Sequence, residues 1–256
     1  MQSSVKICLY KRSKSAVQVP GPLWNDSNLK RYTSIGGQDR TKPLPYNPSD
    51  PIRKQVEASF QNSLANLHTT YLDSYILHSP LKTIDYTLEA WRALMALQDE
   101  GKVHMIGVSN TYDIHTIQTL SRERKVQVVQ NRWYEGNDWD KSVVNYCREH
   151  DIHYQYVSEL LLANDSYRQR NPTRRSFWTL SGSPSLWSHP SLIAIANASN
   201  CTPAQAVFKL AQLEGITPLS GTTDEVHMQQ DLEVENIQFV PANDPNLNVV
   251  RQYVLD

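Results

Sequence analysis

The sequence predicts an α/β fold with a parallel sheet, and the stretch from Tyr71 to Asn110 carries this prediction. Residues 71–77 are rich in β-forming residues and apolar enough for a buried strand, and residues 103–108 form a second, short apolar run. Between them, apolar residues recur from Ile84 to Met95 at the 3.6-residue period of a helix, and Gly101 provides a helix stop. A helix that connects two such strands is a crossover, so the two strands are expected to be parallel.

The same alternation continues on both sides of this stretch. An amphipathic helix is expected at residues 52–67, directly before the strand that begins at Tyr71. Thr202 is expected to cap a helix whose first turn contains Pro203. The other expected strands are 29–33, 126–133, 152–155 and 216–220, and the other expected helices are 113–124, 141–150, 191–200, 203–214 and 224–232.

Composition and charge exclude several classes of protein. The chain has 256 residues and a mass of 29.3 kDa, which fits one large domain or two small ones. Its net charge of −1 gives no electrostatic reason to bind nucleic acid or an anionic membrane. No apolar run approaches the ~18 residues of a membrane span. Cys8, Cys147 and Cys201 lack metal-ligand or paired spacing, so we interpret them as reduced thiols of a cytoplasmic protein.

Polar side chains stand where the two strands of the central stretch end. His78 follows the first strand, and Ser109 and Asn110 close the second. Parallel sheets bind ligands at the carboxyl ends of their strands, so these three residues are expected on one rim. The spacing alone leaves a structural interpretation open, because a histidine or asparagine at a strand end can also be a rim residue or a turn cap.

Several sequence blocks resemble one enzyme family. YLDSYILHSP, EGKVHMIGVSN and VVQNRW are similar to segments of the aldo-keto reductases. GGQDR at 36–40, SFWTLSG at 176–182 and PLSGTT at 218–223 resemble the fungal and plant branch of that family. The similarity extends from about Leu29 to Asp231. It implies a (β/α)8 barrel that reduces a small-molecule carbonyl with NADPH, and the branch motifs favour a fungal terpenoid or polyketide pathway.

The resemblance also implies roles for individual residues. His78 matches the histidine that orients the carbonyl, and Arg31 stands at the position of the family's lysine, with the same charge in a different geometry. The cofactor positions are Ser109, Asn110 and Gln130 for the nicotinamide carboxamide, Phe177 for stacking on its ring, and Leu219, Ser220, Gly221, Thr222 and His227 for the phosphate-binding loop. That loop is also compatible with an ordinary capping turn. Leu219 and His227 replace basic residues found in many relatives, so NAD stays open beside NADP, and no metal site is implied.

The chain departs from the family pattern in two places. Residues 1–28 show no similarity to the first two βα units, which carry the family's catalytic Asp and proton-donating Tyr. We therefore expect an incomplete barrel of six strands at residues 29–256, preceded by a poorly ordered segment. Residues 156–175 interrupt the seventh strand and are expected to loop out as an insertion or to break the strand, because their charges would lose hydration inside a sheet.

The missing Tyr and Asp leave three interpretations of function. The first is an active carbonyl reductase. The second is a truncated remnant without catalytic activity, and the third is an interaction protein that binds nucleotide without turnover. The sequence does not specify the substrate or the oligomeric state, because the loops that shape such pockets vary freely.

Overall fold

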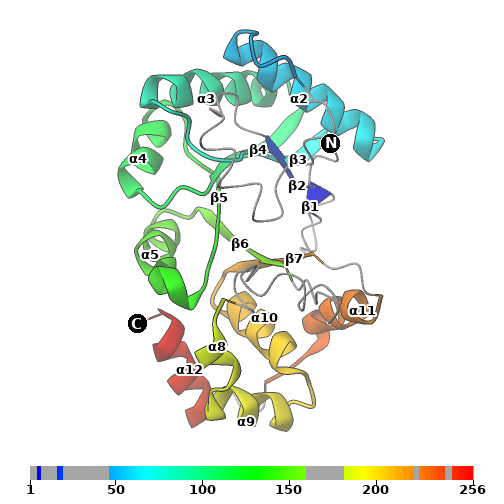
Figure 1. The fold of residues 1–256 in the computed structure, drawn as a ribbon, viewed down its shortest axis with the longest axis vertical. Coiled ribbons are helices and arrows are strands. Elements are labelled where there is room, and N and C mark those ends of the chain that lie inside the picture. The colour runs from blue at the N-terminus through cyan, green and yellow to red at the C-terminus, as the bar shows by residue number, and fades with distance from the viewer. Residues whose placement is uncertain are drawn as a thin grey trace, which may run out of the picture. The chain divides into compact units, whose positions relative to one another are not determined.

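The computed structural model describes residues 5–6, 16–19, 46–159, 182–221, 225–239 and 244–255. The chain divides into two compact units, which are described separately. Unit 1 comprises Met1–Asn131 and Glu149–His153, and unit 2 comprises Arg132–Arg148 and Tyr154–Asp256. Both units combine strands with helices, so the predicted α/β class is confirmed (Figure 1).

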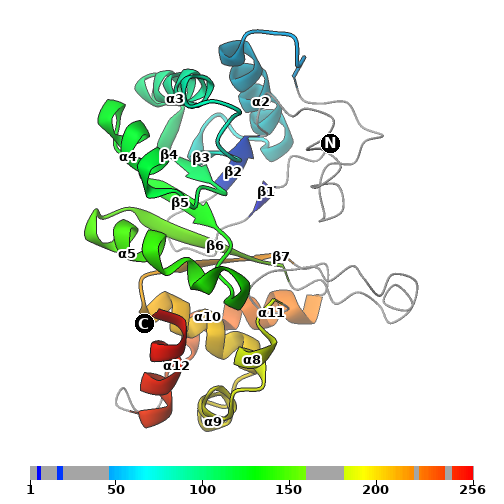
Figure 2. The same ribbon diagram turned by 60° about the vertical axis from the view of Figure 1, so that its left-hand side comes forward.

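In its described residues, unit 1 is a sheet accompanied by three helices. Its elements are β1 (Val5–Lys6), β2 (Ala16–Val19), α2 (Ile52–Leu67), β3 (Leu72–Leu77), α3 (Ile84–Asp99), β4 (Val103–Ser109), α4 (Ile114–Glu123) and β5 (Val128–Asn131). Strands β2 to β5 are parallel neighbours in chain order, and β1 pairs antiparallel with β2. The predicted crossover from β3 through α3 to β4 is thus confirmed. Helices α2 and α3 lie side by side (Figures 1 and 2).

The core of unit 1 forms between the first helices and the middle of the sheet. All six residues of β3 are buried, as expected for a parallel strand covered on both faces. Phe60 of α2 meets Tyr75 of β3 edge to face, with ring centroids 5.4 Å apart. The Tyr75 hydroxyl donates to the backbone carbonyl of Val56 at 3.3 Å, which satisfies a polar atom inside the core. Trp91 of α3 is fully buried.

Strands β1 and β2 are the described part of residues 1–28, the segment that we expect to be poorly ordered. Strand β2 pairs with β3 from Ala16 opposite Ser74 to Val19 opposite Leu77. This pairing gives β3 a parallel neighbour on the side away from β4. The backbone groups of an open edge bind any suitable strand, and a valine-containing segment fits one. The strand expected at 29–33 lies outside the described residues.

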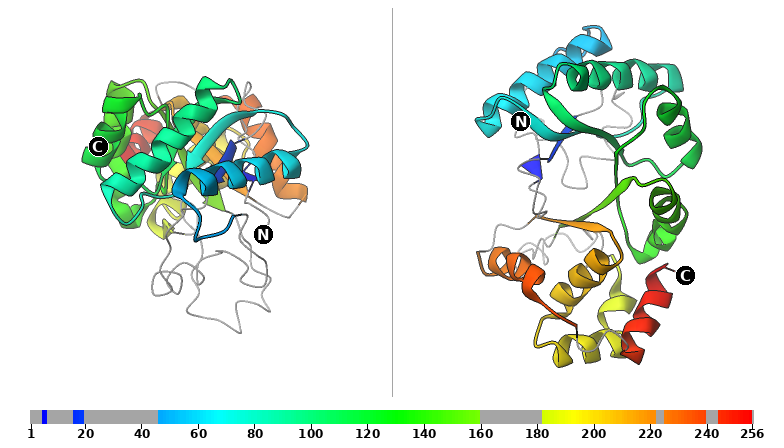
Figure 3. Two further views of the ribbon diagram at one scale, coloured as in Figure 1. Left: turned by 90° about the horizontal axis from the view of Figure 1, so that it is seen from above. Right: turned by 180° about the vertical axis from the view of Figure 1, so that it is seen from behind.

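Unit 2 contains a parallel strand pair and a group of helices. Its elements are η1 (Glu135–Asp140), α5 (Lys141–Glu149), β6 (His153–Glu159), α8 (Pro184–Trp187), α9 (Pro190–Ala198), α10 (Pro203–Leu213), β7 (Thr217–Gly221), α11 (Glu225–Glu233), η2 (Val234–Asn236) and α12 (Pro245–Leu255). Helix α9 packs against α8, α10 and α12 (Figure 3). Thr202 and Gln205 cap α10 reciprocally, and Pro203 occupies its first turn, which confirms the predicted helix start.

Strand β6 continues through residues that were expected to belong to an insertion. Gln155–Glu159 pairs with Thr217–Gly221 of β7, so residues 156–159 extend the strand and do not loop out. Tyr156 is fully buried, and its ring centroid lies 5.2 Å from that of Trp133 and 6.4 Å from that of Phe208. Aromatic contacts of this kind stabilise the strand at the position where the polar segment begins. Residues 160–175 of the expected insertion lie outside the described residues.

Burial of Cys147 on α5 predicts a loss of stability in alkali. Burial, together with the nearby Asp140 carboxylate, raises the pKa of the thiol from 9.0 to about 12. The unfolded thiol ionises near its ordinary pKa while the folded thiol keeps its proton. This contribution to stability is therefore complete below pH 9.0 and is lost as the pH rises towards about 12. The limiting slope is about 1.4 kcal/mol per pH unit.

Urea unfolding at several values between about pH 7.5 and about pH 10.5 measures this effect. In Cys147→Ala, the free energy of unfolding should fall less steeply with pH than in the parent chain. Cys201→Ala is a matched control, because Cys201 is only partly buried. Equal pH slopes in the parent chain and Cys147→Ala would contradict the prediction.

Candidate functional site

The carboxyl ends of β3, β4 and β5 bring four of the predicted site residues together in unit 1. His78 follows β3 and is partly exposed. Ser109 is the last residue of β4 and stands directly opposite Gln130 of β5, and each is only 2% exposed. Asn110 follows Ser109 and is partly exposed. The common rim that the strand order predicts is therefore present.

Asn110 connects all three strand ends. Its backbone N–H donates to the Gln130 carbonyl at 3.1 Å, and its side-chain Nδ2 donates to the His78 carbonyl at 2.8 Å. The same Nδ2 lies 3.3 Å from Ser109 Oγ. The residue has a φ of 50°, in the left-handed region that asparagine tolerates better than most side chains. No donor among the described residues reaches its Oδ1, so this acceptor is available to a ligand.

A second pair of residues behind Asn110 was not predicted from the sequence. Thr111 N–H donates to Asn131 Oδ1 at 2.9 Å, and Asn131 Nδ2 donates back to the Thr111 carbonyl at 2.8 Å. Thr111 Oγ1 donates to the Ser109 carbonyl at 3.0 Å. Thr111 and Asn131 are each 1% exposed. The side-chain amide of Asn131 therefore acts as one more rung of the β4–β5 ladder, beyond the last pair of strand residues.

Two tyrosines of unit 1 are poorly suited to give a proton to a substrate. Burial raises the pKa of Tyr46 to about 12, and burial also raises the pKa of Tyr75. A catalytic acid at neutral pH needs a pKa shifted in the other direction. The hydroxyl of Tyr75 is moreover committed to the Val56 carbonyl.

The remaining predicted site residues lie in unit 2 or outside the described residues. Ser220 and Gly221 end β7 opposite Ser158 and Glu159 of β6. Leu219 is fully buried in β7, and His227 lies in the first turn of α11. Arg31, Phe177 and Thr222 lie outside the described residues, so their predicted roles stay predictions.

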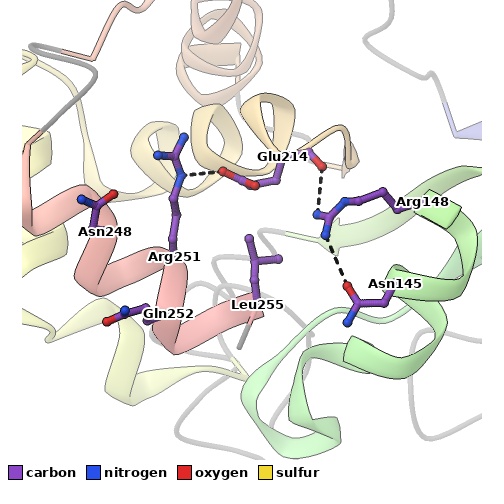
Figure 4. Close-up of a pocket in the computed structure, with 7 residues that line it drawn as sticks. All are labelled: Asn145, Arg148, Glu214, Asn248, Arg251, Gln252 and Leu255. Atoms are coloured by element: carbon purple, nitrogen blue, oxygen red, sulfur yellow. Dashed lines mark hydrogen bonds and ion pairs between the residues drawn. The ribbon is translucent and has the colours of Figure 1, made fainter.

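A polar pocket of about 470 Å³ occupies a different part of unit 2 (Figure 4). Glu214, at the end of α10, stands between two arginines. Its carboxylate accepts from Arg251 Nε at 2.6 Å, and its carbonyl accepts from Arg148 Nη2 at 3.4 Å. Arginines stabilise the free carbonyls and the negative dipole at helix carboxyl ends. The pocket thus lies where helix ends are held. Arg148 and Glu214 precede β6 and β7 in the chain, and Leu219–Gly221 at the carboxyl end of β7 do not line the pocket.

Metal clusters and membrane-spanning helices are both absent from the part of the chain that the structure describes. That part holds no group of three or more His, Cys, Asp and Glu residues arranged to bind a metal ion. None of its helices is long and apolar enough to cross a membrane.

Comparison with known sequences matches this chain to enzymes. It is 28% identical over 187 residues to the uncharacterized oxidoreductase YtbE of Bacillus subtilis, covering 73% of this chain and 58% of YtbE. It is 38% identical over 79 residues to the methylglyoxal reductase DkgA of Escherichia coli, covering 31% of this chain and 28% of DkgA. The chain therefore spans well under two thirds of the length of these relatives.

Comparison with solved structures gives the same fold. An aldo/keto reductase from Brucella melitensis superposes with a TM-score of 0.63 at 18% identity, covering 93% of this chain and 84% of that one. The Bombyx mori aldo-keto reductase AKR2E4, solved in complex with NADP, superposes with a TM-score of 0.63 at 20% identity, covering 96% and 72%. The family model described as the aldo/keto reductase family matches residues 40–244. The chain belongs to the aldo/keto reductase family.

Proposed function

We propose that the rim formed by His78, Ser109, Asn110 and Gln130 holds the nicotinamide end of NADP(H), and that the chain reduces the carbonyl of a small molecule to an alcohol. The observation that carries the proposal is the geometry of Asn110. Its side-chain nitrogen is anchored to the strand end at His78, and its Oδ1 is left to accept a hydrogen bond. Family membership supports the reaction class, and two solved relatives are complexes with NADPH and NADP.

The rim fits the carboxamide group of nicotinamide. That group presents an N–H₂ donor and a carbonyl acceptor. Asn110 Oδ1 is a suitable acceptor for the donor, and the hydroxyl of Ser109 and the amide of Gln130 supply groups for the carbonyl. Ser109 and Gln130 are directly opposed in the β4–β5 ladder, so strand pairing fixes their spacing. A rim set by paired strands loses little conformational entropy when a ligand binds.

In the proposed reaction a hydride reaches the carbonyl carbon and a proton reaches its oxygen, which gives an alcohol and oxidised cofactor. NADPH supplies the hydride when it is bound. His78 has the role of orienting the carbonyl oxygen at the end of β3. Arg31 is proposed to provide the positive charge that the family places near the proton donor.

A second candidate is a chain that binds NADPH without turnover. The sequence lacks a match to the family's proton-donating Tyr, and burial raises the pKa values of Tyr46 and Tyr75. Loss of a positioned proton donor lowers the rate by roughly 10²- to 10⁴-fold. Binding would survive this loss, because the carboxamide contacts do not involve the proton donor.

Fluorescence of NADPH titrated with the purified full chain separates these candidates. Methylglyoxal is then added as the test carbonyl, because relatives include methylglyoxal reductases, and loss of NADPH absorbance is followed. Binding with turnover supports the reductase, and binding without turnover supports the second candidate. Absence of binding would overturn both. The same titration with NADH tests whether the chain prefers NADP. Leu219 and His227 stand where many relatives have a lysine and an arginine, so these two side chains do not reproduce the family's phosphate contacts.

The biological setting is proposed from sequence blocks alone. GGQDR, SFWTLSG and PLSGTT resemble the fungal branch, which supports a step in a terpenoid or polyketide pathway of the cytoplasm. Residues 29–256 are proposed as the reductase domain. The loop at Ser220–Thr222 with His227 is proposed to bind cofactor phosphate.

A further inference from the structure

Asn131 places its side-chain amide where the β4–β5 ladder ends. The last pair of strand residues is Ser109 opposite Gln130, and Asn110 N–H donates to the Gln130 carbonyl one step further. The two hydrogen bonds between Asn131 and Thr111 then continue the ladder through a side chain. This amide fixes both the N–H and the C=O of the residue directly after Asn110.

Burial makes this side-chain rung hard to replace. Asn131 and Thr111 are each 1% exposed, so water cannot readily take over either hydrogen bond. A buried backbone group that loses its partner carries a desolvation cost, and the chain relieves this cost by moving. The backbone movement would displace Asn110, the residue before Thr111, which has a left-handed φ of 50° and a side chain anchored to the His78 carbonyl.

We infer that Asn131 is a positioning residue for the cofactor: its amide fixes the turn at Asn110 and Thr111, and thereby the direction of Asn110 Oδ1. The inference rests on the proposed function, since it concerns the same rim. In this role Asn131 acts through Thr111 and Asn110 and needs no contact of its own with the cofactor. Substitution should therefore weaken NADPH binding while leaving the folded chain intact.

The test uses NADPH fluorescence titration of the full chain and two variants at Asn131. Asn131→Leu should raise the Kd for NADPH about tenfold, as expected when a buried hydrogen-bond pair is lost. Asn131→Asp should bind in a pH-dependent way. Its protonated carboxyl can donate to the Thr111 carbonyl and accept from Thr111 N–H, whereas its ionised form cannot donate. NADPH affinity of this variant should fall as the pH rises through the carboxyl pKa, more steeply than that of the parent chain.

Gln127 provides a matched control at the other end of the same strand pair. Its Oε1 accepts from the backbone N–H of Ile106 at 3.0 Å, so it is also a side-chain amide that bridges to β4. Gln127→Leu should lower stability and leave the Kd for NADPH unchanged. Equal Kd changes in Gln127→Leu and Asn131→Leu, or a pH profile of Asn131→Asp identical to that of the parent, would overturn the inference. Failure of the parent chain to bind NADPH would instead overturn the proposed function.

Discussion

Replacement of Gly107 by alanine is expected to destabilise unit 1 strongly, because the added methyl group has no room between two paired strands. Gly107 lies in β4 directly opposite Val128 of β5. A Cβ atom at this position would stand 2.3 Å from the Val128 carbonyl oxygen and 2.7 Å from the Val128 Cβ. Both neighbours are rigid parts of the paired strand, so the strands must separate. We expect a loss of roughly 3 kcal/mol, the upper part of the range for overpacking.

A loss of that size is a large share of the ~5–15 kcal/mol by which domains are stable. The midpoint of urea unfolding, followed by circular dichroism, measures it. Gly101→Ala is the matched control, because no atom lies within 4 Å of its added Cβ and only its φ of 70° opposes the change. That variant should lose about 1 kcal/mol. Similar midpoints for the two variants would show that β4 and β5 are not packed as described.

The second large effect is expected at Asn110. Asn110→Ala removes the hydrogen bond from Nδ2 to the His78 carbonyl and the Oδ1 acceptor proposed for the carboxamide. It also places alanine at a φ of 50°, which costs roughly 1–2 kcal/mol. If the rim holds nicotinamide, the Kd for NADPH should rise about 10- to 100-fold, as expected for the loss of one or two such contacts.

Substitution of Asn200 is a control that separates the loss of the Asn110 side-chain contacts from the backbone strain of alanine at a left-handed φ. It also has a φ of 50°, but it follows α9 in unit 2. Asn200→Ala should lower the free energy of unfolding without changing NADPH affinity, as measured by fluorescence titration. Matching affinity losses at Asn110 and Asn200 would mean that strain lowers binding in general and that the Asn110 side chain has no special part in it.

The central crossover was predictable because its signals are long and periodic. The strand at Leu72–Leu77 is rich in β-forming residues, and α3 repeats its apolar stripe over four turns before Gly101. Helix α12 was missed although Leu247, Val250 and Val254 have helical spacing, so its signal was present in the sequence. Strands β1 and β2 gave too little pattern, since strands of two and four residues barely show a period.

The candidate site was predictable only where a polar residue stands at the end of a predicted strand. His78, Ser109 and Asn110 could be placed on one rim because parallel strands end together. Asn131 was not predicted, because it lies inside the strand expected at 126–133 and nothing local shows that its amide faces Thr111. The end of β6 escaped for a related reason. The charged residues later in 156–175 suggested a loop, whereas pairing with β7 and aromatic packing of Tyr156 are non-local.

The side-chain amides at the two ends of the β4–β5 pair also oppose a shift in the register of the two strands. Gln127 engages Ile106 before the ladder begins, and Asn131 engages Thr111 after it ends. A shift of two residues would keep every side chain on its proper face and so would cost little in burial. It would, however, break the hydrogen bonds of both amides and leave the buried polar groups of Asn131 and Thr111 without partners. In the short strand β5, two side-chain amides thus fix the register with β4, which longer strands fix through more paired residues.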